Sequence, residues 1–209
     1  MRPIELSIGA ESTIYKVERW GKEFALKWRH KKPYLHPEID RQLRTARTTR
    51  ECRMLNFARL NGITTPTIHA VDLTENTIMM DYIKGEQLKQ LVPVISSKRL
   101  RSLCFDFGRT LAKLHNSNVV HGDPTTSNFI VDSHDDLWVL DFGLAEWNAT
   151  AEMKGVDLHL VRRVLETTHW DVQEAMLEAT LKGYVSTIGD EAEHILSRME
   201  EIRERGRYH

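Results

Sequence analysis

The chain has little cysteine and no long hydrophobic run. Its 209 residues include only two cysteines, Cys52 and Cys104, which are far apart and show no paired spacing. A disulfide framework and a zinc site are therefore disfavoured, and a reducing compartment is expected. No segment near Met1 resembles a signal peptide, and no apolar run reaches the roughly 18–20 residues that span a bilayer. These absences predict a cytoplasmic protein without a membrane segment.

Net charge is also nearly absent, although the charges are unevenly placed. The formal net charge is −1, but between Lys27 and Arg59 ten basic residues face three acidic ones, a local balance of +7. Five arginines recur at every third position from Arg41 to Arg53, which on a helix gives a slowly drifting basic ribbon. Two interpretations stay open: a solvated helix face, or a docking surface for nucleic acid or an acidic partner.

Internal repeats and low-complexity tracts are missing too, and the first part of the chain has the pattern of strands around one helix. Residues 14–20 and 24–28 alternate and are rich in β-branched and aromatic types, which predicts two strands joined at Gly21 and Lys22. A long helix is predicted from 38 to 61 with a stop at Gly62, then two short strands at 67–73 and 77–82. Gly85 is the expected hinge.

After Gly85 the pattern becomes helical. A helix with one buried stripe is predicted at 96–115, followed by a loop and a strand hairpin that turns at 135–136. Three further helices are predicted, at about 154–168, 171–187 and 190–205. The sequence therefore predicts an α+β, bilobal, protein-kinase-like fold. Its N-lobe would cover residues 1–84 with the nucleotide lid, and its reduced helical C-lobe residues 85–209.

The most informative stretch is residues 121–128 (HGDPTTSN), followed by the tripeptide DFG at 141–143. Asp123 and Asn128 lie five positions apart, and Asp141 comes thirteen residues later. Carboxylate and amide oxygens are ligands that magnesium accepts while sharing substrate phosphates, which suits Asn128 and Asp141. Asp123 would position a hydroxyl or a water and take its proton. The ordered set predicts transfer of the terminal phosphoryl group of ATP with Mg²⁺ as cofactor.

Upstream residues supply the rest of the predicted nucleotide site. Lys27 ends an Ala-Leu-Lys strand similar to the Val-Ala-Ile-Lys strand of protein kinases, where the lysine holds the α- and β-phosphates. Glu51, midway along the following helix, would aim that lysine. The turn at Gly9 keeps a single glycine of the usual phosphate-covering motif, and it would offer backbone N–H groups and the Ser12 hydroxyl.

The segment that joins the lobes and the histidine of the loop complete the set. Adenine is expected between the lobes, against backbone groups of Asp81, Tyr82 and Ile83. His121 is expected to hold the loop in shape rather than to bind a metal. A lone lysine or glutamate usually lies on the surface, so these assignments depend on the order of the whole set.

Two features of protein kinases are missing. Gly122 stands where they carry an arginine for a phosphorylated activation loop, and no Ala-Pro-Glu segment lies between Gly143 and Asp157. The site is therefore expected to be constitutively assembled or controlled by a partner protein. Thr125 replaces the lysine that serine/threonine kinases place near the γ-phosphate, which disfavours efficient transfer to a protein hydroxyl.

Several segments together resemble one family. They are residues 32–40 (KPYLHPEID), 47–51 (RTTRE), 62–66 (GITTP), the 121–128 loop and the terminal 205–207 (RGR). From about Ile8 to its end the chain resembles the small atypical kinase/ATPase subunit of the KEOPS (EKC) complex, also called the PRPK or piD family.

The resemblance implies ATP and Mg²⁺ binding, autophosphorylation on serine or threonine, and ATP hydrolysis. It implies partners in the KEOPS complex, chiefly a metal-dependent transferase subunit that installs threonylcarbamoyl on tRNA adenosine, and a small subunit on the N-lobe. It also implies a basic tail, Arg203, Arg205, Gly206 and Arg207, that reaches toward the transferase. The basic ribbon on the long helix would then face tRNA or a partner.

Two other functional classes stay open. HGD loops also occur in small-molecule phosphotransferases, although the helical lobe is too short for their separate acceptor pocket. A non-catalytic ATP-binding scaffold is the other alternative. Against it, the five side chains expected for catalysis are all present: Lys27, Glu51, Asp123, Asn128 and Asp141. Whether water or a protein hydroxyl accepts the phosphoryl group is left undecided by the residues.

Overall fold

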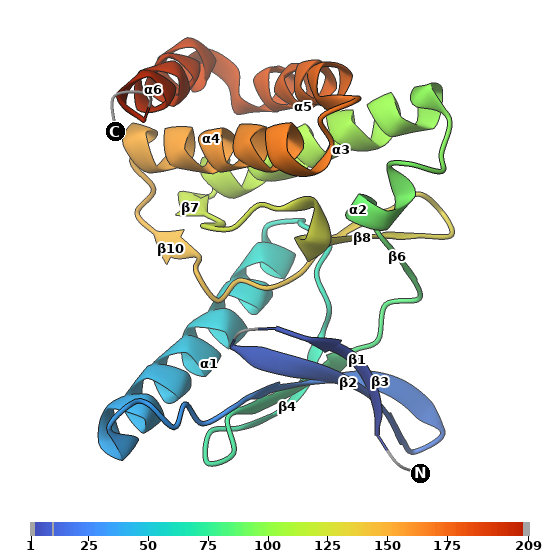
Figure 1. Ribbon diagram of the computed structural model, residues 1–209, viewed down its shortest axis with the longest axis vertical. Helices are drawn as coiled ribbons and strands as arrows, with labels where there is room; N and C mark the ends of the chain where they lie inside the picture. The colour runs from blue at the N-terminus through green and yellow to red at the C-terminus, as the bar shows by residue number, and fades with distance from the viewer. Residues whose placement is uncertain (1–2, 10, 207–209) are drawn as a thin grey trace.

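The structure, a computed structural model, describes residues 3–9 and 11–206, which form two lobes (Figure 1). Arg207 of the predicted basic tail, and the Tyr208 and His209 that follow it, lie outside the described residues. No helix within the described ranges combines the length and apolar composition of a membrane span.

The N-lobe is built on a five-stranded antiparallel sheet with the order β1-β2-β3-β5-β4. Its strands are β1 (Ile4–Ile8), β2 (Ser12–Arg19), β3 (Lys22–Arg29), β4 (Ile68–Asp72) and β5 (Thr77–Asp81). The loop between β2 and β3 is Trp20–Gly21, one residue earlier than predicted. Both residues have positive φ, 52° and 71°, which suits the right-handed twist of a two-residue hairpin.

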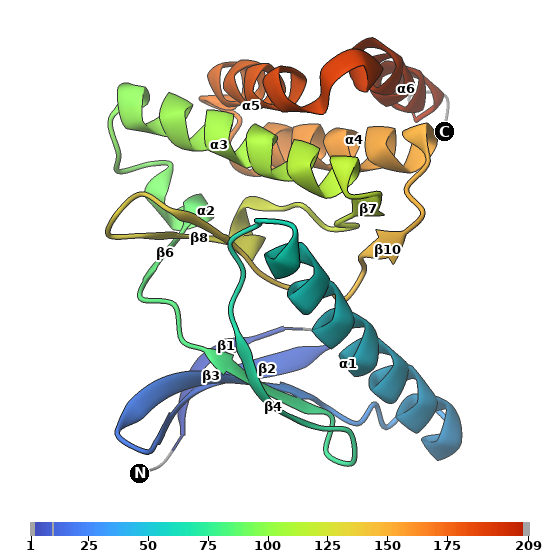
Figure 2. The same ribbon diagram turned by 180° about the vertical axis from the view of Figure 1, so that it is seen from behind.

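Helix α1 (Pro37–Leu60) runs from the N-lobe toward the C-lobe (Figures 1 and 2). It begins with a proline at its first position, which suits a residue without an N–H, and the His36 side chain accepts a hydrogen bond from Glu38 N. Gly62 follows its end with φ 73°, as its stop signal predicted. One face of α1 is buried, and it carries Glu51 beside Met54, Leu55 and Ala58.

Three arginines of the predicted basic ribbon on α1 form ion pairs with acidic side chains of the same chain. Arg44 is buried, and its Nε lies 2.8 Å from Asp40 Oδ2. Arg47 pairs with Glu11, and Arg41 pairs with Glu38. Arg44 is therefore removed from the exposed ribbon, whereas Arg41 stays exposed on the helix surface with its charge paired.

The C-lobe stacks its helices in two layers, with α5 and α6 packed on α3 and α4 (Figure 1). Beneath them lie a three-stranded sheet, β6-β8-β9, and a two-stranded one, β10-β7. The elements are β6 (Gly85–Gln87), α2 (Leu88–Leu91), α3 (Ser97–Asn116), β7 (Val119–Val120), η1 (Thr126–Asn128), β8 (Phe129–Asp132), β9 (Leu137–Val139), β10 (Glu146–Trp147), α4 (Ala151–Thr168), α5 (Gln173–Ile188), η2 (Gly189–Glu191) and α6 (Ala192–Arg205).

The predicted apolar stripe of α3 forms the centre of the C-lobe core. Its side chains are all at most 5% exposed: Leu100, Leu103, Phe107, Leu111 and Leu114. Full burial of one such side chain contributes about 1.5–3 kcal/mol, so this stripe fixes the lobe on which the site is built.

The expected hinge at Gly85 is wrong. Gly85 is the first residue of β6 and pairs with Asp132 of β8. A Cβ atom there would lie 2.3 Å from the carbonyl oxygen of Val131, so close packing requires glycine at this position. The connection between the lobes is the preceding segment, residues 82–84. The division into residues 1–84 and 85–209 stays a prediction.

Candidate active site

A cleft of about 520 Å³ lies between the two lobes, a size typical of small-molecule sites. Eight of the nine predicted site residues line it: Gly9, Ser12, Lys27, Glu51, Asp81, Ile83, Asn128 and Asp141. The ninth, Asp123, lines an adjoining cavity of about 250 Å³. The fold therefore brings together residues that span most of the chain.

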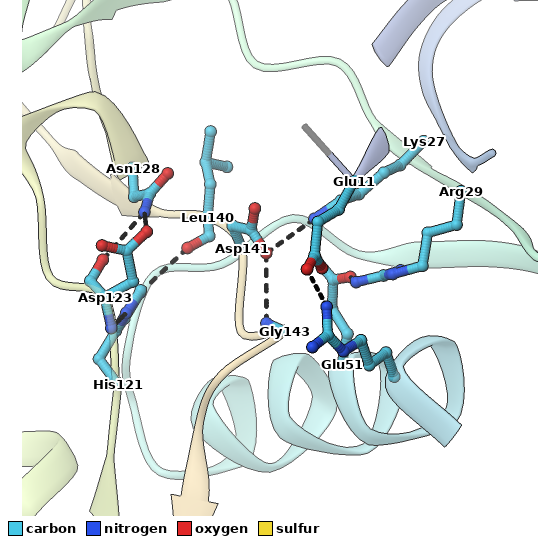
Figure 3. A network of polar contacts seen from close by, with 11 residues as sticks. Glu11, Lys27, Arg29, Glu51, His121, Asp123, Asn128, Leu140, Asp141 and Gly143 are labelled. Atoms are coloured by element: carbon cyan, nitrogen blue, oxygen red, sulfur yellow. Dashed lines mark hydrogen bonds and ion pairs between the residues drawn. The ribbon is translucent and has the colours of Figure 1, made fainter. Parts of the chain in front are cut away.

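Lys27 joins the two lobes through its amine. Strand β3 aims it inward, and its Nζ lies 2.7 Å from Glu51 Oε1 on α1 and 2.8 Å from Asp141 Oδ1 in the C-lobe (Figure 3). Burial by itself would lower the pKa of Lys27, but the two carboxylates more than offset it and raise that pKa. Lys27 is therefore a permanent cation at the cleft wall.

Asp141 is held in an unusual backbone conformation two residues after β9. Its φ is 53°, in the left-handed region that non-glycine residues rarely adopt, and such residues cluster at functional sites. Its Oδ1 accepts from Gly143 N at 3.2 Å as well as from Lys27, which leaves Oδ2 for another cation. Burial raises the pKa of Asp141, but Lys27 more than offsets this, so the pKa is lowered and the group is ionised.

Asn128 and Asp123 are joined by hydrogen bonds within the loop 121–128. Asn128 Nδ2 donates to Asp123 Oδ2 at 3.0 Å and to its carbonyl oxygen at 2.9 Å (Figure 3). Because both partners are acceptors, the amide nitrogen must face Asp123, and the amide oxygen is left for a ligand. Oxygen atoms of Asn128 and Asp141 thus border one cleft, and they fit a hard cation such as Mg²⁺.

His121 is fully buried and supports the loop. Its Nδ1 accepts from Asp123 N at 3.3 Å, so Nε2 carries the proton and donates to the Leu140 carbonyl oxygen at 3.1 Å. Its ring lies against the rings of Phe129 and Phe142. The histidine therefore connects the loop to Leu140, the residue before Asp141, in the structural role predicted for it.

The phosphate-covering turn offers less than predicted. Gly9 N already donates to the Ser12 carbonyl oxygen at 2.8 Å, so this N–H is not available to a phosphate. Ser12 lines both cavities, which leaves its hydroxyl as the nearer donor. Ala10, the next residue of the predicted turn, lies outside the described residues.

The Asp81 side chain is held by neighbouring groups, whereas the prediction for Asp81 concerned its backbone. It accepts from Thr67 N at 2.8 Å and contacts His69 Nε2 at 2.7 Å, and its own N–H donates to the Thr67 carbonyl oxygen. Because the Asp81 N–H is already bonded, the Asp81 carbonyl oxygen and the backbone of Ile83 are the groups left to contact adenine. Recognition of adenine by the backbone of residues 81–83 stays a prediction.

Comparison with known proteins places this geometry in a family. The model of the protein kinase domain matches residues 5–176. KEOPS complex subunit Bud32 of Pyrococcus abyssi is 41% identical over 207 residues, covering 96% of this chain and 94% of the relative. The chain belongs to the Bud32 family of protein-kinase-like proteins. Both the predicted fold class and the predicted family are thereby confirmed.

Other members of the Bud32 family extend the comparison. The EKC/KEOPS complex subunit bud32 of Dictyostelium discoideum is 31% identical, covering 98% of this chain and 82% of the relative. A probable bifunctional tRNA threonylcarbamoyladenosine biosynthesis protein of Methanosarcina barkeri is 40% identical over 97% of this chain. The chain spans only 35% of the length of that bifunctional relative.

The absence of the protein-kinase arginine at position 122 has a steric explanation. Gly122 has φ 79°, and a Cβ atom there would lie 2.3 Å from the Leu144 carbonyl oxygen. The backbone of the segment after DFG thus occupies the space that an arginine side chain would need. The short segment and the glycine are two parts of one packing arrangement.

Asp157 on α4 is a residue that sequence reasoning missed. Its carboxylate is 1% exposed and accepts from His121 N at 2.7 Å and Gly122 N at 2.9 Å, and it contacts His115 Nε2 at 3.2 Å. It therefore fixes the backbone just before Asp123. A signal was present, because Asp157 lies on the apolar stripe that buries Leu158 on the same helix.

Arg29 and Glu11 were also missed. Arg29 Nη2 lies 2.5 Å from Glu51 Oε2, so one buried carboxylate serves both Lys27 and Arg29. Glu11 pairs with Arg47 and lies 3.7 Å from Lys32 Nζ, which connects the phosphate-covering turn to α1. The signal for Arg29 was its position two residues after Lys27, because alternate residues of a strand share a face.

Proposed function

We propose that this chain is an Mg-ATP-dependent atypical serine/threonine kinase with ATPase activity. One observation carries the proposal: Lys27, aimed by Glu51, meets Asp141 at 2.8 Å across the cleft that Asn128 also lines. A nucleoside triphosphate requires a fixed cation for its phosphates, and its metal requires fixed oxygen ligands on the opposite side.

The roles follow from the contacts. Lys27 binds the α- and β-phosphates, and Asp141 Oδ2 with the Asn128 amide oxygen holds magnesium. When bound, magnesium neutralises charge that develops on the β- and γ-phosphates during transfer. Ser12 donates its hydroxyl to the phosphates, and Gly9 lets the turn lie close above them. The adenine edge contacts the backbone of Asp81 and Ile83.

Asp123 positions the acceptor of the phosphoryl group and takes its proton. It orients a water or a serine or threonine hydroxyl in line with the γ-phosphorus and accepts the proton as the new oxygen–phosphorus bond forms. The bond to the bridging oxygen of ADP breaks, and that oxygen leaves with the electron pair. Water as acceptor gives ADP and phosphate, whereas a hydroxyl gives ADP and a phosphoprotein. The Asn128 amide, which donates to Asp123, keeps the carboxylate aimed.

The relatives' names support a place in tRNA modification. We propose that the chain acts as a subunit of the KEOPS complex, beside its metal-dependent threonylcarbamoyl transferase subunit and a small subunit on the N-lobe. It would then meet tRNA through the complex. A cytoplasmic location stays a prediction of the sequence.

Turnover of radiolabelled ATP tests this function. We expect the chain with Mg²⁺ to release labelled phosphate or to label itself, and the transferase subunit with tRNA to stimulate release. Turnover that responds only to small-molecule acceptors would instead indicate a small-molecule phosphotransferase. ATP binding without turnover under any of these conditions would leave a non-catalytic scaffold.

A further inference from the structure

Arg29 is a buried cation to which the proposed mechanism gives no task. It ends β3, and its side chain is 4% exposed. Its Nη2 donates to Glu51 Oε2, but in the described part of the chain its Nε and Nη1, both shielded from solvent, have no hydrogen-bond partner. A guanidinium has five N–H donors, and buried donors of this kind are normally satisfied. Two unsatisfied nitrogen atoms on one buried cation therefore point to a partner that the folded chain does not itself supply.

The position of Arg29 indicates what that partner is. Arg29 lines the 250 Å³ cavity together with Lys27, Asp123 and Asp141. Its Nη2 lies 3.1 Å from where a Cβ atom on Gly143 would be, so the guanidinium lies directly beside the DFG turn. The cavity thus holds the acceptor-orienting carboxylate at one side and a partly unpaired guanidinium at another.

We propose that Arg29 binds the terminal phosphate of ATP and supplies the positive charge that Thr125 does not. The inference rests on the proposed function of the same site. Arginine suits this role because its planar fork matches phosphate oxygens in pairs. The hydrogen bond from Arg29 Nη2 to Glu51 is kept, and Nε and Nη1 donate to the γ-phosphate when it binds in the cavity.

Equilibrium binding of ATP and of ADP separates this role from a structural one. ADP lacks the terminal phosphate, so a γ-phosphate ligand affects ATP alone. Arg29→Gln is expected to weaken ATP binding about 10- to 100-fold, as loss of a charged hydrogen bond does, and ADP binding less than about threefold. Titration calorimetry with each nucleotide in Mg²⁺ measures both affinities without turnover.

Two further variants make the test sharp. Arg29→Lys keeps the charge without the fork and is expected to recover part of the ATP affinity. Arg41→Gln removes an arginine of α1 that is paired with Glu38 on the exposed surface, and it should leave the ratio of ATP to ADP affinity unchanged. Thermal unfolding of each variant checks the fold. If Arg29→Gln does not fold, the ratio of ATP to ADP affinity of Arg29→Lys alone tests the inference.

Equal weakening for both nucleotides would overturn the inference, because it would mean that Arg29 acts only through Glu51 and Lys27. Unchanged affinities would overturn it as well. Failure of the wild-type chain to bind either nucleotide would instead refute the proposed function, so the two failures are distinguishable.

Discussion

Replacing Asp141 by asparagine is expected to lower ATP turnover about 1,000-fold while the chain stays folded. The carboxylate is the charged oxygen ligand that we propose for magnesium, and it also pairs with Lys27 at 2.8 Å. Asparagine keeps the size of the side chain and tolerates the left-handed conformation at φ 53°, so the backbone has no reason to change. Turnover is measured with radiolabelled ATP at saturating Mg²⁺, and circular dichroism checks the fold.

Asp136→Asn is the matched control for Asp141→Asn. Asp136 lies exposed in the hairpin turn between β8 and β9, away from the cleft lining, and its loss should leave turnover unchanged. Undiminished turnover by folded Asp141→Asn would falsify the assignment of Asp141 as a magnesium ligand.

Restoring the arginine of protein kinases at position 122 is expected to destabilise the chain by about 3 kcal/mol or more. The side chain must enter at φ 79°, and its Cβ would lie 2.3 Å from the Leu144 carbonyl oxygen. The segment after DFG then has to move. Denaturant unfolding of Gly122→Arg against the wild-type chain measures the loss.

Gly21→Arg separates the two causes of that loss. Gly21 has a similar φ of 71°, but nothing lies within 4 Å of a Cβ built there. We expect it to cost only about 1–2 kcal/mol, the backbone contribution alone. If both variants lose the same stability, collision with the segment after DFG is not the reason that glycine occupies position 122.

Long elements with clear end signals could be predicted from the sequence. The helix expected at 38–61 is α1 (Pro37–Leu60), and that expected at 96–115 is α3 (Ser97–Asn116), capped by Ser96. The elements without a prediction of their own are short, such as α2 (Leu88–Leu91) and β7 (Val119–Val120). Two to four residues are too few to show a period, and tertiary pairing alone makes them regular.

The site residues divide in the same way, into those that a local pattern or chain order indicates and those that only long-range contacts reveal. Asp123, Asn128 and Asp141 could be found because their spacing is local, and Lys27 with Glu51 by their order along the chain. The position of Asp157 on the apolar stripe signals its burial, but its hydrogen bonds could not be predicted, because they join it to residues 35 and 36 positions away.

Some ion pairs of the basic ribbon could not be predicted for a similar reason. Arg47 pairs with Glu11 across the N-lobe, and no local pattern shows that. The partner of Arg44, Asp40, is four residues earlier on the same helix. That second pair was visible in the sequence, because residues four apart on a helix are neighbours.

A structure of the chain with magnesium and a non-hydrolysable ATP analogue tests the central claim most directly. The account predicts the α- and β-phosphates at the Lys27 amine and the γ-phosphate toward Asp123, with the metal about 2.1 Å from an oxygen of Asn128 and one of Asp141. A nucleotide bound elsewhere, or a metal that touches neither side chain, would contradict it.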